Sequence, residues 1–91
     1  MTINDKIPAS ALLVDLRDPE DYSRGHLPGA VNFTVQEIIS EAPHDRMICL
    51  YCYAGMKSLM ATTALKAKGF KQVENLGGVN RYTGELVREN D

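Results

Sequence analysis

Short runs of apolar residues alternate with polar, turn-forming stretches along the chain. Within each run the apolar side chains follow one another with little alternation, as expected for strands that are buried on both faces. Strands are predicted for residues 11–14, 30–33 and 47–51, and more weakly for residues 72–76. The last is the weakest because only Val73 and Leu76 in it are apolar.

Two short helices are predicted between these strands. The first begins at Asp18, because Asp is a preferred N-cap and the following Pro19 suits the first helical position. It ends near Arg24, where Gly25 interrupts the helical pattern. The second covers residues 35–39, whose pattern is amphipathic, and the proline that follows prevents it from continuing.

The longest predicted helix covers residues 59–68, which contain no Gly or Pro. Ser58 is expected to be its N-cap, and Gly69 suits the left-handed position at which many helices end. Phe70 can then fold back on Leu65, as in a Schellman motif. The positions with helical spacing that are expected to face the sheet are Ala61, Ala64, Leu65 and Lys68.

The alternation of strands and helices predicts an α/β fold. Residues 77–78 predict a turn, and Val79 the start of a last helix. Strands that alternate with helices form a parallel sheet with helices on both faces, joined by right-handed crossovers. A chain of 91 residues is long enough for one domain, so residues 1–91 are expected to form a single domain. Ligands of such sheets bind at the carboxyl ends of the strands.

Charge and hydropathy argue against two classes of partner. The chain has 12 acidic and 10 basic residues mixed along its length, with a formal net charge of −2. It has no positive field to attract nucleic acid or anionic lipid, and neither partner is expected. The longest apolar stretch, residues 47–54, is too short to span a bilayer. Residues 1–5 lack the layout of a signal peptide, so a cytoplasmic location is expected.

The two cysteines, Cys49 and Cys52, form a C-x-x-C pattern. Such a pair can be a redox motif or half of a zinc site. Cys49 lies inside the predicted strand 47–51, which does not fit a redox motif at a helix start. The two histidines, His26 and His44, stand alone without ligand spacing, so no metal site is expected.

Cys52 stands where a buried strand leads through a short loop into a helix. The unpaired N–H groups and the positive dipole end of a helix favour an anion, and a thiolate is such an anion. Gly55 would let the backbone approach the sulfur closely, and Lys57 would add positive charge. The same spacing also suits a structural cysteine at the end of a core strand. Spacing alone leaves both interpretations open.

Three segments stand in a distinctive order: DLRDPEDY with GHLPGAVN (residues 15–22 and 25–32), CYAGMKS (residues 52–58) and LGGV (residues 76–79). Together they resemble the rhodanese family, and the resemblance covers most of the chain. It implies the family's fold, a three-layer sandwich in which a five-stranded, mostly parallel sheet lies between helices on both faces.

The resemblance also implies a thiosulfate sulfurtransferase without a cofactor. Cys52 would take the outer sulfur of thiosulfate or a similar small donor, release sulfite and hold the sulfur as a persulfide. Cyanide or a thiol, on a small molecule or on a sulfur-accepting protein, would then remove it. The groups that bind the sulfur and its donor would come from Tyr53, Ala54, Gly55, Met56, Lys57 and Ser58, mainly through their backbones. Lys57 would also attract the anionic donor.

Three further residues lie near the predicted site. Arg17 either reaches the pocket as a secondary site residue or, as we favour, pairs with a carboxylate such as Glu20 or Asp21. Asp15 and His26 are expected to be structural, tying the first strand and the following turn to the rest of the domain.

Two other functions share this fold. Related phosphatases use a C-x5-R loop, whose arginine binds phosphate through a planar fork. The sixth residue after Cys52 is Ser58, and Lys57 comes one position early without such a fork, so phosphatase activity is not expected. The alternative that stays open is a non-enzymatic rhodanese-like module, either a sulfur carrier that hands its persulfide to a partner protein or a regulatory binding module. Modules of the regulatory kind commonly lack the cysteine that this chain has.

Overall fold

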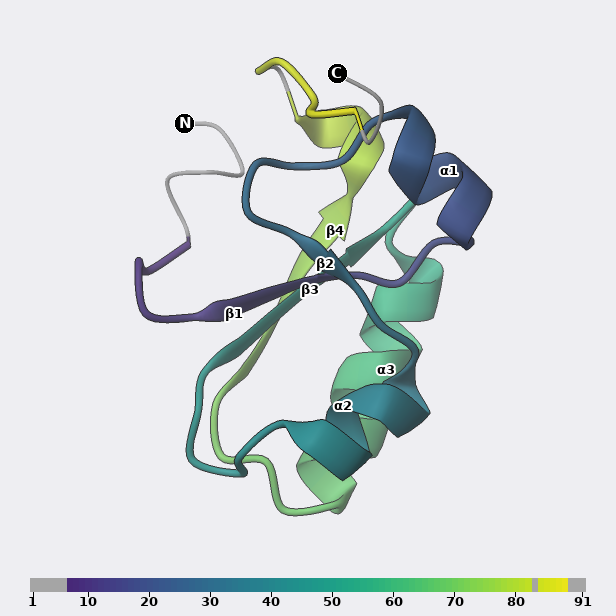
Figure 1. Ribbon diagram of the computed structural model, residues 1–91. Coiled ribbons are helices and arrows are strands. Elements are labelled where there is room, and N and C mark those ends of the chain that lie inside the picture. Colours follow the sequence, from purple (N-terminus) through teal and green to yellow (C-terminus); the bar gives the residue numbers. More distant parts are fainter. Residues whose placement is uncertain (1–6, 83, 89–91) are drawn as a thin grey trace.

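The computed structural model describes residues 7–82 and 84–88. These residues form strands, α-helices and one short 3₁₀-helix (Figure 1). In chain order they are β1 (Leu12–Asp15), α1 (Pro19–Arg24), β2 (Val31–Asn32), α2 (Val35–Glu41), β3 (Ile48–Cys52), α3 (Met56–Ala67), β4 (Val73–Gly78) and the 3₁₀-helix η2 (Val79–Arg81). None of the described helices is long and apolar enough to cross a membrane.

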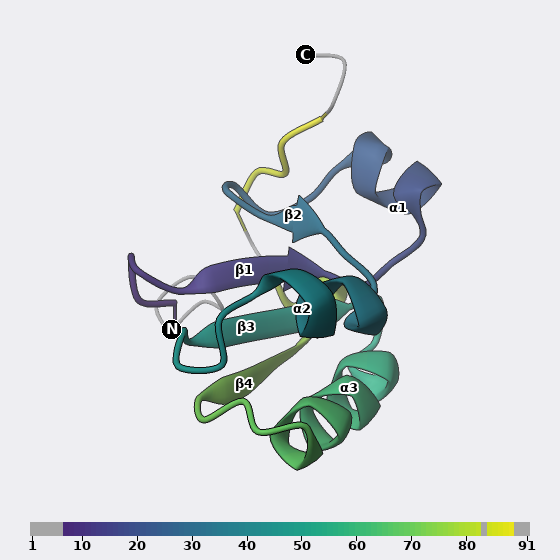
Figure 2. The same ribbon diagram turned by 60° about the horizontal axis from the view of Figure 1, so that its bottom comes forward.

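The strands form one parallel sheet in the order β2-β1-β3-β4 (Figure 2). The α/β class and the parallel sheet are as predicted. The implied number of five strands is wrong for the described residues, which contain a 4-stranded sheet. Each strand corresponds to one of the four apolar runs of the sequence, and within residues 7–82 and 84–88 no further run is available to add a strand.

Helices α2 and α3 cover one face of the sheet (Figures 1 and 2). Ile48, Leu50 and Cys52 of β3 point toward this face, because side chains alternate along a strand. They belong to one buried cluster with Ile38 of α2 and Leu65 of α3. The side chain of Cys52 is thereby fixed between the sheet and α3.

The opposite face is covered mainly by irregular chain. Its buried cluster consists of Leu13, Leu27, Ala30, Cys49, Tyr51 and Leu76. Tyr22 of α1 and Val79 of η2 pack against this cluster, although α1 has no buried residue. Val87 near the C-terminus pairs in antiparallel fashion with His26 and ties the end of the chain to this side. The expected three layers are present, with the second helical layer thinner than the first.

Three predicted helix ends are confirmed. Helix α1 has Asp18 as its N-cap and Gly25 as its C-cap. After α3 the chain makes the Schellman arrangement, in which the N–H of Phe70 donates to the carbonyl of Leu65 at 3.1 Å. Gly69 has the positive φ, 98°, that this arrangement requires.

Three predictions about helices and turns are wrong. The buried face of α3 includes Ser58 and Thr62, whereas Ala64 and Lys68 are exposed. Thr62 is tolerated in the core because its hydroxyl donates to the carbonyl of Ser58 at 2.8 Å. Residues 77–78 belong to β4 instead of forming a turn, and the last predicted helix is reduced to the single turn η2. β4 continues through its two glycines because the loop after Cys52 lies directly against them.

Candidate active site

Cys52 is the last residue of β3 and lies at the carboxyl edge of the sheet. Only 4% of it is exposed. Residues 53–55 connect it to α3, which begins at Met56 with Gly55 as its N-cap. The prediction that Ser58 is the N-cap is therefore wrong, since the left-handed conformation of Gly55 starts the helix earlier. The early start places Ser58 within the first helical turn.

The sulfur of Cys52 is surrounded by hydrogen-bond donors. The N–H groups of Gly55 and Ser58 donate to Sγ, with distances of 3.0 and 3.4 Å. The thiol of Cys52 in turn donates to the hydroxyl oxygen of Ser58, 3.4 Å away. Because the two N–H groups belong to the N-terminus of a helix of 12 residues, the helix dipole adds to their effect. The arrangement favours a negatively charged sulfur.

Two opposing effects act on the pKa of the Cys52 thiol. Burial raises the pKa, whereas the hydrogen bond with the Ser58 side chain and those from the N–H groups of Ser58, Gly55 and Lys57 lower it. The hydrogen bonds outweigh burial, so the pKa of Cys52 lies below the ordinary value of a thiol. For Cys49, burial and then the charge of Glu74 raise the pKa. Of the two thiols, Cys52 is the one disposed to ionise.

The loop after Cys52 lies directly against the end of β4. Gly55 has a φ of 100°, and a Cβ on it would lie 3.3 Å from the Cα of Gly77. A Cβ on Gly78 would lie 2.8 Å from the Cα of Ala54 and closer still to the carbonyl of Tyr53. A register shift between β3 and β4 places residues 77 and 78 opposite the last two residues of β3. Both glycines thus continue the strand beneath the loop, Gly78 because a larger residue would not fit there and Gly77 with a positive φ of 93° that favours glycine.

A second set of hydrogen bonds holds Ser58 beneath Cys52. The Ser58 hydroxyl donates to Oδ1 of Asn75 at 2.6 Å, and the N–H of Gly77 donates to the same oxygen at 2.9 Å. Asn75 lies in β4 and was not predicted as a site residue. The only signal in the sequence was a polar side chain between the two apolar positions of the weakest strand.

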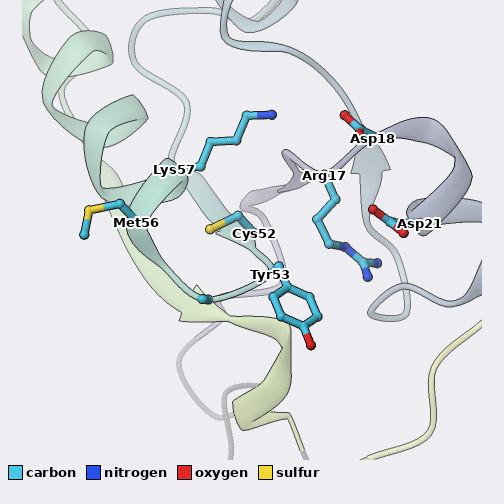
Figure 3. A pocket seen from close by; sticks show the side chains of 8 residues that line it. Arg17, Asp18, Asp21, Cys52, Tyr53, Met56 and Lys57 are labelled. Carbon is cyan, nitrogen blue, oxygen red and sulfur yellow. The ribbon is translucent and has the colours of Figure 1, made fainter.

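Cys52 opens into a hollow of about 310 Å³ at the surface (Figure 3). Met56 and Lys57 of α3 lie on one side of the sulfur, and Arg17 lies on the other. The hollow is lined by Arg17, Asp18, Asp21, Cys52, Tyr53, Ala54, Met56 and Lys57. Gly55 and Ser58 reach the sulfur through the hydrogen bonds described above. The structure thus brings the whole predicted loop together and adds Asp18 and Asp21, which were not predicted.

Arg17 pairs with a carboxylate, and the partner is Asp15, not Glu20 or Asp21. Its guanidinium donates to both carboxylate oxygens of Asp15, with a shortest distance of 2.7 Å, and also to the carbonyl of Gly25. Burial lowers the pKa of Arg17, but the hydrogen bonds and charge of Asp15 more than offset burial and raise it. Arg17 therefore lines the hollow as a fixed positive charge.

Asp15 and His26 lie in the structural positions that were expected. The buried carboxylate of Asp15 also accepts from the hydroxyl of Tyr51 at 2.8 Å, and this hydroxyl accepts from the N–H of Leu27 at 3.0 Å. His26 is buried, stacks on Tyr22 with 3.8 Å between ring centroids, and has Nδ1 2.8 Å from the carbonyl of Tyr22. In the part of the chain that the structure describes, no three His, Cys, Asp or Glu side chains are grouped to hold a metal ion.

Sequence comparisons relate the chain to sulfur-transferring proteins. The family model of the rhodanese-like domain matches residues 3–85. A thiosulfate sulfurtransferase GlpE from Pseudomonas entomophila is 34% identical over 88 residues, which cover 88% of this chain and 81% of the relative. A tRNA sulfurtransferase from Desulfurococcus amylolyticus is 37% identical over 84 residues, which cover 92% of this chain and 17% of the relative. The chain thus spans only a small part of that longer protein.

Comparison with solved structures gives the same fold. A rhodanese from E. coli, solved with anions, has a TM-score of 0.74 and 29% identity, covering 86% of this chain and 98% of its own. A rhodanese-like domain protein from Staphylococcus aureus has a TM-score of 0.78 at 20% identity, covering 98% of this chain and 96% of its own. The second likeness concerns the fold alone.

Proposed function

Because the chain belongs to the rhodanese-like domain family, we propose that it is a sulfurtransferase in which Cys52 carries the transferred sulfur as a persulfide. The observation that carries this proposal is the set of donors around Sγ, which lowers the pKa of the Cys52 thiol at the mouth of an open hollow. Relatives named thiosulfate sulfurtransferase support a sulfane-sulfur donor.

The proposed reaction has two displacements at sulfur. In the first, the Cys52 thiolate attacks the outer sulfur of thiosulfate, the S–S bond of thiosulfate breaks, and sulfite leaves with the bonding electrons. In the second, cyanide or a thiolate attacks the outer sulfur of the persulfide, and Cys52 leaves as the thiolate with which the cycle began. Cys52 is thus the nucleophile of the first step and the leaving group of the second.

The loop residues divide these tasks. The N–H groups of Gly55 and Ser58 stabilise negative charge on the Cys52 sulfur when it attacks and when it leaves. Lys57 is exposed at the rim of the hollow, where its charge attracts anionic thiosulfate. Tyr53, Ala54 and Met56 shape the entrance. No metal or organic cofactor is required by this chemistry.

A mass measurement tests the proposal. Incubation with thiosulfate should add one sulfur atom to the intact protein, and dithiothreitol should remove it. Cys52→Ser should abolish the addition. The matched control is Cys49→Ala, which removes the other thiol of the same strand and should leave the addition intact. Wild-type protein that gains no sulfur from thiosulfate would contradict the proposal.

One observation favours a protein as the sulfur acceptor. Tyr53 and Met56 at the hollow are 70% and 69% exposed, and Leu59 and Met60 in the next turn of α3 are 52% and 68% exposed. We call these four residues the apolar rim. Exposed apolar side chains that gather at one place commonly mark a contact surface for another protein. A relative named as a putative sulfur carrier protein is consistent with such a use.

We also infer a reducing compartment such as the cytoplasm. The proposed chemistry needs Cys52 as a free thiol, and both cysteines are free in the structure. Thiols are kept reduced in the cytoplasm, where structural disulfides are rare.

A further inference from the structure

The amide side chain of Asn75 accepts two hydrogen bonds at the base of the site. Its Oδ1 accepts from the hydroxyl of Ser58 at 2.6 Å and from the N–H of Gly77 at 2.9 Å. A backbone N–H can only donate, so the atom that faces both groups must be the amide oxygen and not the amide nitrogen. Asn75 therefore offers the Ser58 hydroxyl an acceptor that is fixed in place by the strand itself.

The Ser58 hydroxyl has a single proton, and several acceptors compete for it. Asn75 Oδ1 is the nearest at 2.6 Å, followed by the carbonyls of Gly55 at 3.1 Å and Gly77 at 3.4 Å. While the proton points to Asn75, Ser58 presents a lone pair to Cys52 and accepts a hydrogen bond from its thiol at 3.4 Å. To donate to a thiolate instead, the hydroxyl must turn away from Asn75.

We propose that Asn75 is a positioning residue that controls the reactivity of Cys52 by competing with its sulfur for the proton of the Ser58 hydroxyl. The competition favours the protonated thiol and opposes the thiolate. It thereby keeps the thiolate more basic than the backbone donors alone would make it, and a more basic thiolate is a stronger nucleophile. The inference rests on the proposed function only in taking Cys52 as the nucleophile.

Charged groups around Cys52 act independently of this competition. Lys57 reaches the hollow from α3, Arg17 from the segment after β1, and Asp18 and Asp21 from the start of α1. Glu74, next to Asn75 in β4, pairs in register with Cys49. An uncharged substitution of Asn75 leaves all of these charges in place, so it changes only the competition for the Ser58 proton and the partner of the Gly77 N–H.

The experiment measures the pH dependence of Cys52 alkylation by iodoacetamide, in a Cys49→Ala background that has a single thiol. With Asn75→Ala, the midpoint should fall by about half to one pH unit, because the hydroxyl becomes free to donate to the thiolate. With Asn75→Asp, the midpoint should rise, because a carboxylate binds the proton more strongly and adds negative charge near the sulfur. A merely structural disturbance would move both variants in the same direction.

A double-mutant cycle tests whether Asn75 acts through Ser58. In a Ser58→Ala background, Asn75→Ala should leave the midpoint unchanged, since no hydroxyl proton is left to compete for. A shift that persists without Ser58, or two Asn75 variants that shift the midpoint together, would overturn the inference. Circular dichroism would show whether Asn75→Ala folds. If it does not, Asn75→Asp is compared in the presence and absence of the Ser58 hydroxyl. The upward shift of the midpoint should be smaller in the Ser58→Ala background, and an equal shift would refute the inference.

The alkylation assay needs no sulfur donor. Failure of the protein to take sulfur from thiosulfate would refute the proposed function and leave these midpoints meaningful, so the two failures are distinguishable.

Discussion

Cys49 and Cys52 lie on the same strand, yet their thiols meet different surroundings. Cys49 points into the apolar cluster on one face of the sheet, where burial raises its pKa. Cys52 points to the other face and reaches the start of α3, where backbone N–H groups lower its pKa. Two cysteines of similar burial thus differ in reactivity because only one of them reaches hydrogen-bond donors.

The first prediction concerns the pH dependence of these thiols. Alkylation by iodoacetamide should modify Cys52 alone in the folded protein, and its rate should rise with pH around a midpoint below about 8.5, the value of a free thiol. Intact mass should show one modification in native protein and a second only after unfolding. A midpoint at or above the free value, or early modification of Cys49, would contradict this assignment.

The same shift affects stability, with a definite sign. Because folding lowers the pKa of Cys52, the unfolded chain binds more protons than the folded chain at pH values between the two pKa values. The contribution of Cys52 to the free energy of unfolding is therefore present above the unfolded pKa and is lost as the pH falls through the folded pKa.

At the scale of elements, the reactive loop depends on three segments that are far apart in sequence. β3 ends at Cys52, α3 begins at Met56, and the end of β4 lies beneath the loop between them. Gly78 has an ordinary φ of −100°, so its importance comes from space and not from its backbone conformation. The shape of the loop around Cys52 is therefore set partly by a strand that contributes no side chain to the hollow.

Gly78→Ala should distort the loop because the new Cβ meets the backbone of Tyr53 and Ala54. We expect a loss of about 1–3 kcal/mol in the free energy of unfolding and a clear decrease in sulfur loading from thiosulfate. Denaturant unfolding and intact mass measure the two effects.

Gly29→Ala is the matched control for this substitution. Gly29 has a φ of 83° and open space around it, away from Cys52, so alanine adds backbone strain without a clash. It should lower the free energy of unfolding by about 1 kcal/mol and leave sulfur loading unchanged. Equal loading by both variants would show that Gly78 does not shape the loop.

At the scale of the whole molecule, the exposed apolar side chains are unevenly distributed. In residues 7–82 and 84–88, the large exposed ones are the apolar rim, together with Leu86 and Val87 near the C-terminus. The rim lies on the start of α3 and on the loop that leads to it, at the carboxyl edge of the sheet. Under the proposed function, a protein acceptor that docks there would bring its thiol close to Cys52.

Met60→Lys tests this surface without touching the hollow, which Met60 does not line. The assay starts from the persulfide form and measures the rate at which an acceptor removes the sulfur. With cyanide as the acceptor the rate should be unchanged. With reduced thioredoxin, used as a protein thiol, the rate should fall by about five-fold or more because an apolar contact is lost. Gln72→Lys is the matched control, because it adds the same charge at an exposed position before β4, at the other end of the sheet. Equal slowing by both variants, or none by Met60→Lys, would argue against docking at the rim.

Local signals in the sequence were sufficient for much of the fold. Continuous apolar runs predicted β1 and β3, and the residues Asp18 and Gly69 marked helix ends, because these preferences act between neighbours in the chain. The loop after Cys52 was also predictable, since its strand, glycine and helix are consecutive. Family resemblance, in contrast, suggested one strand more than the described residues contain.

Contacts between distant segments could not be predicted in this way. The competition for the Ser58 proton depends on Asn75, which β4 places beneath α3 from 17 positions further along the chain. The strand conformation of residues 77–78 depends on the loop that lies against them. In both cases the deciding neighbour is brought in by tertiary packing, which no local pattern shows. Asp15 is different, because it is only two positions from Arg17 and was missed among several nearby carboxylates.

Under the proposed function, the separation of Cys49 and Cys52 also affects how long a sulfur atom stays bound to Cys52. Positions three apart on a strand are about 10 Å apart, beyond the roughly 4.4–6.8 Å between Cα atoms that a disulfide allows. Cys49 therefore cannot attack the persulfide to form an internal disulfide and release hydrogen sulfide. The chain has no other cysteine that could do so. A sulfur atom held on Cys52 must wait for a molecule from outside, so the lifetime of the loaded protein is set by the acceptor it meets.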